Sequence, residues 1–255
     1  MLLTNKIAVI HGAGGAIGGA VARTFAREGA KVFLSGRNAE PVEAVARDIV
    51  AAGGEAEVAQ VDVLDEDAIE KYTAKVIRKA GRIDVVFNAI GFRVLQGVPL
   101  TDLKRDDFIS PIVSWTTTQF LTSRTAARHM VQKRSGVILT LSASPARLAV
   151  ASTAGFGVAC AAIEGLTRTL AAELGPQGVR VVCIRPHRIG DTLGPDPDFP
   201  VGEAEEFRSL IEGWTLLKRL PSLADVASTA AFLASDHADA MTGTVANLTC
   251  GMSVD

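Results

Sequence analysis

The sequence predicts a single α/β domain, residues 1–255, in which helices cover both faces of a doubly wound parallel sheet. Short runs rich in Val and Ile alternate along the whole chain with longer segments of helical periodicity. The short runs are apolar almost throughout, which is typical of strands buried on both faces. No linker, repeat or charge block interrupts the 255 residues. One three-layer domain follows from these observations.

The apolar runs give the expected strands, and the periodic segments between them give the expected helices. The strands are expected at Ile7–Ile10, Lys31–Leu34, Glu57–Val61, Val85–Asn88, Val137–Leu141, Arg180–Ile184 and Thr244–Leu248. The helices are expected at Ile17–Glu28, Pro41–Ala51, Ala68–Lys79, Lys104–Met130, Phe156–Leu174, Glu203–Gly213 and Ala224–Leu233. Glycines 29, 53, 54, 81 and 175 follow expected helix ends, where a left-handed cap is favoured.

The pattern loosens between Ile189 and Leu220 into a stretch rich in Pro, Gly and Asp. An insertion late in an α/β chain is a typical place for a substrate lid, which we expect near residues 190–220. Phe199, Phe207 and Trp214 make this lid partly apolar.

Composition narrows the classes of partner. The formal net charge is −2 and no basic block is present, so nucleic acid is not expected as a partner. The apolar run Ile7–Ile10 is too short for a signal segment or a membrane span. Cys160, Cys183 and Cys250 are scattered without ligand spacing. We expect a cytoplasmic protein that binds a small molecule and holds no metal.

A glycine-rich loop directly follows the first expected strand and opens the first expected helix. Its small or apolar residues are Gly12, Gly14, Gly15, Ala16, Ile17 and Gly18. Such residues let the backbone approach a pyrophosphate, whose charge then lies at the helix N-terminus. The strand before and the helix after this loop are the context that a dinucleotide site requires. The loop therefore predicts nucleotide binding.

Arg37 follows the second expected strand, where an acidic residue would bind the ribose 2′-hydroxyl of NAD. The planar guanidinium suits a 2′-phosphate instead, so NADP(H) is favoured over NAD(H) as the cofactor. In the alternative interpretation Arg37 is only a solvated loop cation.

Further short sequence motifs lie at other positions along the chain. They are Asp62 and Val63 after the third strand, Asn88-Ala89-Ile90-Gly91 after the fourth, the segment Glu164–Leu174, Gly178 through Pro186, and Thr242-Gly243 with Asn247 and Gly251. With the glycine loop, they make the chain resemble the short-chain dehydrogenase/reductase family over essentially its whole length. The resemblance implies a Rossmann-type seven-stranded sheet and a homo-dimer or homo-tetramer packed through two long helices. It also implies Asp62 and Val63 at the adenine, Asn88 and Ala89 near the ribose, and Pro186 and Thr192 near the nicotinamide.

The catalytic residues of that family are replaced in this chain. Aligning Glu164-Gly165-Leu166 with the family puts Phe156 at the position of the proton-donating Tyr and Cys160 at that of its Lys. The same register puts Ala143 at the Ser position, and Trp115 stands where the family has Asn. The only tyrosine is Tyr72, and no lysine lies between Lys133 and Lys218, so no register supplies a Tyr-xxx-Lys motif.

Three residues are candidate substitutes for the missing groups. Ser142 and Ser144 lie at the carboxyl end of a central strand, where either contacts a substrate carbonyl or simply forms a turn. His187 follows Pro186 and has a side chain suited to proton transfer. A loop histidine that faces water is the competing interpretation of His187.

Four other side chains near the expected site have ordinary structural interpretations. Cys160 is most simply a small buried residue. His11 either touches the nucleotide or fills the turn. Arg147 and Arg185 either bind an anionic substrate or are solvated or paired within the protein.

Two hypotheses about the function are therefore the leading ones. One is an atypical NADP(H)-dependent oxidoreductase, since hydride transfer needs mainly the alignment of nicotinamide and substrate. The other is a non-catalytic NADP(H)-binding protein that acts as a sensor, scaffold or partner subunit. A third hypothesis is a non-redox enzyme that uses the same pocket, because a fold alone does not determine the reaction.

Overall fold

The computed structural model describes residues 1–92, 94–193 and 201–254, with the backbone alone for residues 201–204. Its core is a seven-stranded sheet in the order β3-β2-β1-β4-β5-β6-β7. All six strand pairs are parallel. The strands are β1 Ile7–His11, β2 Lys31–Gly36, β3 Glu55–Gln60, β4 Val85–Asn88, β5 Gly136–Leu141, β6 Val179–Pro186 and β7 Val245–Leu248. The predicted doubly wound fold is confirmed.

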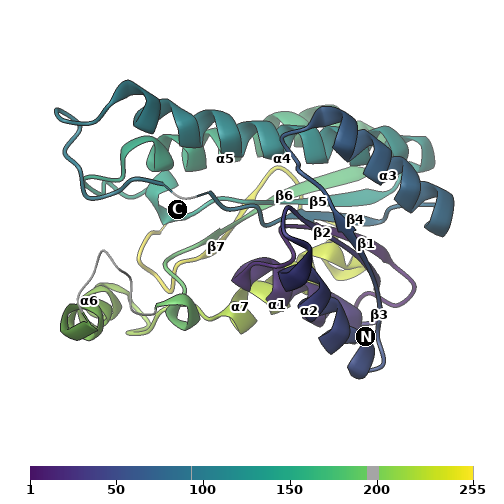
Figure 1. The fold of residues 1–255 in the computed structure, drawn as a ribbon, viewed down its shortest axis with the longest axis horizontal. Coiled ribbons are helices and arrows are strands. Elements are labelled where there is room, and N and C mark those ends of the chain that lie inside the picture. Colours follow the sequence, from purple (N-terminus) through teal and green to yellow (C-terminus); the bar gives the residue numbers. More distant parts are fainter. Residues whose placement is uncertain (93, 194–200, 255) are drawn as a thin grey trace.

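Helices cover both faces of this sheet, as Figure 1 shows. One layer holds α1 (Ala16–Arg27), α2 (Ala39–Ala51) and α7 (Leu223–Ala234), and the other holds α3 (Glu66–Ala80), α4 (Arg105–Lys133) and α5 (Ala154–Leu174). A further helix, α6 (Val201–Trp214), lies apart from both layers. Four short 3-10 turns complete the elements: η1 Ser144–Ala146, η2 Gly175–Gln177, η3 Gly190–Thr192 and η4 Asp236–Ala238.

The sheet has a separate apolar core on each face, because successive side chains of a strand point to opposite sides. Ile10 and Leu34 belong to the cluster packed against α1, α2 and α7. Their neighbours Val9 and Phe33 belong to the cluster on the opposite face. Two-sided burial therefore explains the nearly continuous apolar strands of the sequence.

The element boundaries differ from the predicted ones by a few residues, except for β4, whose bounds are those predicted. The caps expected at Gly54 and Gly175 are not left-handed, and Gly53 alone makes the cap after α2. Gly175 has helical backbone angles, φ −57° and ψ −46°, whereas Gly178 has φ +81°. The chain continues past α5 through η2 and turns only at Gly178. A Cβ atom there would lie 2.7 Å from the carbonyl carbon of Arg134, so glycine is needed for space as well as conformation.

No helix within the described residues combines the length and the apolar character needed to cross a membrane. The longest one, α4, has 29 residues and carries charged side chains along its length, including Arg124 and Arg128.

Two glycines of α5 provide a paired test of how the helical layer packs. Gly155 is buried, and a Cβ atom there would meet the Phe108 carbonyl and lie 2.9 Å from Pro111 Cγ on α4. Gly155→Ala is expected to destabilise the protein by about 1–3 kcal/mol, because overpacking forces the two helices apart. Gly165 has only the end of the Arg168 side chain within 4 Å of its added Cβ.

Gly165→Ala is therefore the matched control, expected to stabilise the helix by about 0.5–1 kcal/mol because alanine loses less conformational entropy. Urea unfolding followed by circular dichroism measures both variants. Equal changes of one sign in the two variants would contradict this account of the α4–α5 contact.

Candidate functional site

The loop between β1 and α1 turns tightly against the end of β4. Gly12 has φ +76°, and a Cβ atom there would lie 2.7 Å from the Ala89 carbonyl oxygen. Only glycine combines this backbone conformation with so close an approach. Gly15 precedes α1 and supplies no side-chain cap to the helix. The first-turn amides of α1 are therefore available to an anion such as a pyrophosphate.

A cavity of about 450 Å³ opens in front of this loop, at the carboxyl edge of the sheet. It lies where the strand order reverses between β1 and β4, which is where ligands bind in doubly wound folds. Of the predicted cofactor residues, its lining includes Gly12, Gly14, Gly15, Ala16, Ile17, Arg37, Ala89, Ile90, Gly91 and Thr192.

The segment from the end of β2 to the first turn of α2 supplies lining residues that the sequence did not single out. These are Gly36, Asn38, Pro41 and Val42. A Cβ atom at Gly14 would lie 2.8 Å from Pro41 Cβ, so the glycine loop and the start of α2 pack closely. This approach joins segments that are separate in the chain, and no local motif encodes it.

Asn88 supports the cavity from behind and does not line it. The side chain is buried, and its Nδ2 donates to Thr122 Oγ1 on α4 at 2.9 Å. Its Oδ1 accepts a hydrogen bond from the Ile90 amide at 2.9 Å. Asn88 therefore fixes the course of the chain through Ala89, Ile90 and Gly91.

Four other predicted cofactor residues also lie outside the lining of this cavity: Gly18, Asp62, Val63 and Pro186. Gly18 packs beneath the loop, where an added Cβ atom would lie 2.8 Å from the Gly12 carbonyl carbon. Asp62 Oδ1 accepts from the Leu64 amide at 3.0 Å and so stabilises its own turn. Val63 is buried in the core beside α3.

His11 is the last residue of β1, and its side chain packs inside the protein and does not line the cavity. Its side chain is buried, and Nδ1 lies 2.8 Å from Ser35 Oγ on β2. The ring packs edge-on against Tyr72, with ring centroids 5.9 Å apart. Burial lowers the pKa of His11 to about 4. The ring is therefore neutral at pH 7 and joins β1 to β2.

Arg37 is exposed at the edge of the cavity. Its guanidinium lies 5.8 Å from the ring centroid of Phe92, and its carbonyl oxygen accepts from Gln60 Nε2 at 2.8 Å. The hydrogen bond holds the backbone of Arg37, and the contact with Phe92 keeps its guanidinium at the rim of the site.

An aromatic pair forms at two of the positions that the sequence aligns with the family's proton-transfer residues. Trp115 on α4 and Phe156 on α5 meet edge-to-face, with ring centroids 4.7 Å apart and planes inclined by 78°. Neither ring has a proton acidic enough for general acid catalysis. The pair therefore makes this end of the α4–α5 contact apolar.

The cysteines are free thiols and provide no reactive centre. Cys160 is fully buried one turn beyond Phe156 on α5, and burial raises its pKa to about 12. The thiol is neutral at pH 7, which agrees with a packing role. Among the residues that the structure describes, no group of three or more His, Cys, Asp and Glu side chains is arranged to hold a metal ion.

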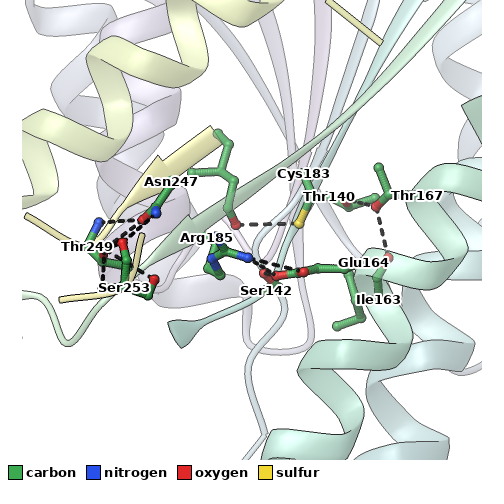
Figure 2. Close-up of polar contacts among 11 residues, drawn as sticks. Thr140, Ser142, Ile163, Glu164, Thr167, Cys183, Arg185, Asn247, Thr249 and Ser253 are labelled. Carbon is green, nitrogen blue, oxygen red and sulfur yellow. Dashed lines mark hydrogen bonds and ion pairs between the residues drawn. The ribbon is translucent and has the colours of Figure 1, made fainter. Parts of the chain in front are cut away.

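Ser142 belongs to a buried ionic network, drawn in Figure 2. Its hydroxyl donates to Glu164 Oε1 on α5 at 3.0 Å. Arg185 Nη1 on β6 donates to both carboxylate oxygens, at 3.2 and 3.3 Å. The three residues are 5 %, 5 % and 1 % exposed. Arg185 is thus paired within the protein, and the network joins β5, β6 and α5.

Ser144 and His187, each two residues beyond a member of this network, are in contact. Ser144 Oγ lies 2.7 Å from His187 Nδ1, although the two residues are 43 positions apart in the chain. The ring is half-buried, and its Nε2 is shielded from water without a hydrogen-bond partner among the described residues. The ring nitrogens of His187 therefore do not face water, contrary to its interpretation as a water-facing loop residue.

The lid region is only partly described. Phe199 lies outside the described residues. Phe207 on α6 is in contact with Arg188, whose guanidinium lies 5.3 Å from the ring centroid. Trp214 is 56 % exposed at the end of α6. The described lid side chains are therefore partly apolar and close to the chain that follows His187.

Comparison with known proteins gives matches along nearly the whole chain. A family model described as "Enoyl-(Acyl carrier protein) reductase" matches residues 12–253. An uncharacterized oxidoreductase of Bacillus subtilis (strain 168), YxbG, is 33 % identical over 245 residues, which cover 94 % of this chain and 88 % of that protein. The 2,3-dihydro-2,3-dihydroxybenzoate dehydrogenase of the same organism is 31 % identical over 249 residues, covering 94 % and 93 %.

A solved structure also matches nearly the whole chain. The NAD⁺-bound form of a xylitol dehydrogenase superposes with a TM-score of 0.90 at 26 % sequence identity. The match covers 98 % of this chain and 100 % of that one.

The buried ion pair predicts a specific pattern of stability. Arg185→Met alone leaves the Glu164 carboxylate buried without its cation, and we expect it to cost about 3–5 kcal/mol of unfolding free energy. Adding Glu164→Leu removes the stranded charge, so the double variant is expected to recover most of that loss. Urea unfolding of both variants and the wild type measures the coupling. A double variant at least as unstable as Arg185→Met would contradict a pairing role for the network.

Proposed function

The chain belongs to the short-chain dehydrogenase/reductase family, and from that premise we propose that it is an NADP(H)-dependent oxidoreductase lacking the family's usual tyrosine and lysine. The cavity at the sheet edge carries this proposal. It combines the glycine loop, the uncapped start of α1 and Arg37 in one lining.

The residues present fit a dinucleotide. Glycine is required at position 12 by the nearby Ala89 carbonyl, and the backbone it leaves exposed suits a pyrophosphate. In the proposed arrangement Gly14 to Ile17 hold the pyrophosphate, and Asp62 with Val63 lies at the adenine. Asn88 and Ala89 are assigned to the ribose, and Pro186 and Thr192 to the nicotinamide, following the family resemblance.

Arg37 supports NADP(H) over NAD(H). The segment from Ser35 to Asn38 contains no carboxylate to accept bonds from a ribose 2′-hydroxyl, and the exposed guanidinium suits a 2′-phosphate. The similar xylitol dehydrogenase was solved with NAD⁺, so the proposed preference for NADP(H) depends on this chain's own Arg37.

The proposed chemistry needs no phenol. The bound nicotinamide would supply or accept the hydride, and the chain would align the substrate and exclude water. Loss of the family's tyrosine removes an effect worth about 10²–10⁴-fold in rate. A slower enzyme, or one with a different proton-transfer group, is consistent with that loss.

A second candidate function is a non-catalytic NADP(H)-binding protein. The edge-to-face contact of Trp115 and Phe156 favours it, because the pair fills the region from which the family's catalytic side chains act. Both candidate functions require a bound cofactor, and they differ only in whether the protein catalyses a reaction.

We also propose a homo-oligomer formed through the α4–α5 layer. Val113 and Phe120 on α4 are 54 % and 42 % exposed, and Val158 on α5 is 46 % exposed. Large apolar side chains on two adjacent helices suit packing against a second copy.

The deciding experiment combines binding with turnover. NADPH and NADP⁺ are titrated by fluorescence, and absorbance at the nicotinamide band is then followed with ketones, quinones, activated alkenes and secondary alcohols. Turnover of any class supports the oxidoreductase. Binding without turnover across the panel supports the non-catalytic protein, and no binding at all overturns both.

Arg37→Ala is predicted to change cofactor preference. Loss of a charge-assisted contact worth about 1.5–3 kcal/mol should weaken NADPH binding roughly 10- to 150-fold. NADH, which has no 2′-phosphate, should bind almost as before. Fluorescence titration of both nucleotides measures the change, and equal weakening of the two would contradict the role assigned to Arg37.

Restoring the family's groups is predicted to create or raise carbonyl reductase activity. The variant combines Ala143→Ser, Phe156→Tyr and Cys160→Lys, and a gain of about 10²-fold or more is expected because a proton donor and its cation return. Phe156→Tyr alone serves as control, since it lacks the lysine. A triple variant that folds and binds NADPH but has no activity would show either that the assigned register is wrong or that Trp115 prevents the reaction.

A further inference from the structure

Arg37 is the one charged side chain among the described residues that line the cofactor cavity. The glycine loop could supply a second cation only if a long side chain replaced one of its glycines. A Cβ atom at Gly14 would already lie 2.8 Å from Pro41 Cβ and 3.2 Å from the Val42 amide nitrogen, so the start of α2 leaves no room for such a side chain there. Recognition of a 2′-phosphate in this cavity therefore depends on where a single guanidinium lies.

Two contacts locate Arg37, one at its backbone and one at its guanidinium. Gln60 at the end of β3 donates to the Arg37 carbonyl oxygen at 2.8 Å. The guanidinium lies over the ring of Phe92, with Cζ 5.8 Å from the ring centroid. Arg37 directly follows β2, Phe92 lies four residues beyond β4, and these two strands are the neighbours of β1 in the sheet. The contact therefore connects the two segments on either side of the strand that leads into the glycine loop.

The contact with Phe92 uses the charge of the guanidinium and none of its hydrogen bonds. An aromatic ring attracts a cation through the negative potential of its face. Within the part of the chain that the structure describes, the Arg37 side chain forms no hydrogen bond and no ion pair. Its N–H groups are therefore available to phosphate oxygens, which a guanidinium binds through two parallel hydrogen bonds.

A ring beneath the guanidinium also lowers the cost of binding. An exposed arginine samples many rotamers, and ordering it on a ligand costs conformational entropy. Phe92 is partly buried and restricts these rotamers before a ligand arrives. Part of the ordering then takes place during folding, so a 2′-phosphate binds an arginine that is already oriented.

We infer that Phe92 is a positioning residue, which strengthens NADP(H) binding by holding the Arg37 guanidinium at the place where the 2′-phosphate binds. This inference rests on the proposed NADP(H)-dependent function. Phe92 does not itself line the cavity, so it acts through Arg37 and contributes nothing to the binding of a nucleotide without a 2′-phosphate. The face of the ring is required, and apolar bulk at this position is not sufficient.

Nucleotide binding tests this role without any turnover. Phe92→Leu keeps the apolar bulk and removes the ring, and it is expected to raise the Kd for NADPH about 2- to 5-fold while the Kd for NADH stays unchanged. Phe92→Tyr keeps the ring face and is expected to have the Kd values of the wild type. Equal weakening of NADPH and NADH in Phe92→Leu, no change in either, or tighter binding of NADPH would each overturn the inference.

Smaller probes locate the effect at the 2′-phosphate. Adenosine 2′,5′-bisphosphate carries this group and AMP does not, and isothermal titration calorimetry measures the affinity of both. Phe92→Leu is expected to weaken the bisphosphate by the same factor as NADPH and to leave AMP unchanged. A loss of AMP affinity would show that Phe92 acts on the adenosine itself, which contradicts the role assigned here.

A double-mutant cycle tests whether Phe92 acts through Arg37. In the Arg37→Ala background the ring has no guanidinium to hold, so Phe92→Leu is expected to cause no further loss of NADPH affinity. A further loss as large as in the wild-type background would show that Phe92 acts independently of Arg37, and the inference would be wrong.

Phe120→Leu is the matched control. Phe120 on α4 is in contact with Arg124, whose guanidinium lies 5.1 Å from the ring centroid, and neither residue lines the cavity. The substitution removes the same kind of contact at another place, and the Kd values for NADPH and NADH should equal those of the wild type. A similar selective loss of NADPH affinity in this variant would contradict a specific role for Phe92.

The two levels of the proposal fail differently. If Arg37→Ala selectively weakens NADPH while Phe92→Leu does not, the role of Phe92 is overturned and the NADP(H) proposal stands. If the wild type binds NADPH no more tightly than NADH, or Arg37→Ala weakens both equally, the proposed preference for NADP(H) fails, and the role of Phe92 fails with it.

Discussion

The approach of Gly12 to the end of β4 is the constraint on which the site depends. The sheet reverses its strand order between β1 and β4, and the chain must pass from β1 into α1 without blocking that crevice. An added Cβ atom at Gly12 would lie 2.7 Å from the Ala89 carbonyl oxygen, so any side chain there would push the loop away from β4. The cavity exists because this contact is made by backbone alone. Asn88 supports the cavity through its hydrogen bonds to Thr122 on α4 and from the Ile90 amide.

The opposite half of the carboxyl edge is organised by charge. Glu164 and Arg185 are buried together, with Ser142 as a further donor to the carboxylate. A buried ion pair adds little net stability, but each partner strongly constrains the position of the other. Here the constraint joins two strand ends to α5. The side chains that follow, Ser144 and His187, meet as a consequence.

Much of the fold could be predicted because its signals are local. Two-sided burial makes the central strands apolar runs, and the bounds expected for β4 from the sequence, Val85–Asn88, are those observed. The glycine loop was recognisable because a strand, small residues and a helix follow one another directly. Gly175 shows the limit: a glycine after a helix indicated a cap, but the chain continued through η2, and Gly178 made the turn. Local pattern did not distinguish two nearby glycines with different backbone conformations.

The sequence by itself determined the fold class, the glycine loop and the absence of a Tyr-xxx-Lys motif. The last of these needed no alignment, since Tyr72 is the only tyrosine and lies in the buried layer against His11. Only the tertiary structure decided which polar side chains meet. His187 and Ser144 are 43 residues apart, and Arg185 and Glu164 are 21 apart. These pairings follow from β6 lying beside β5 and from α5 packing across both, and strand neighbours in a parallel sheet are set by long-range packing that no local sequence pattern encodes.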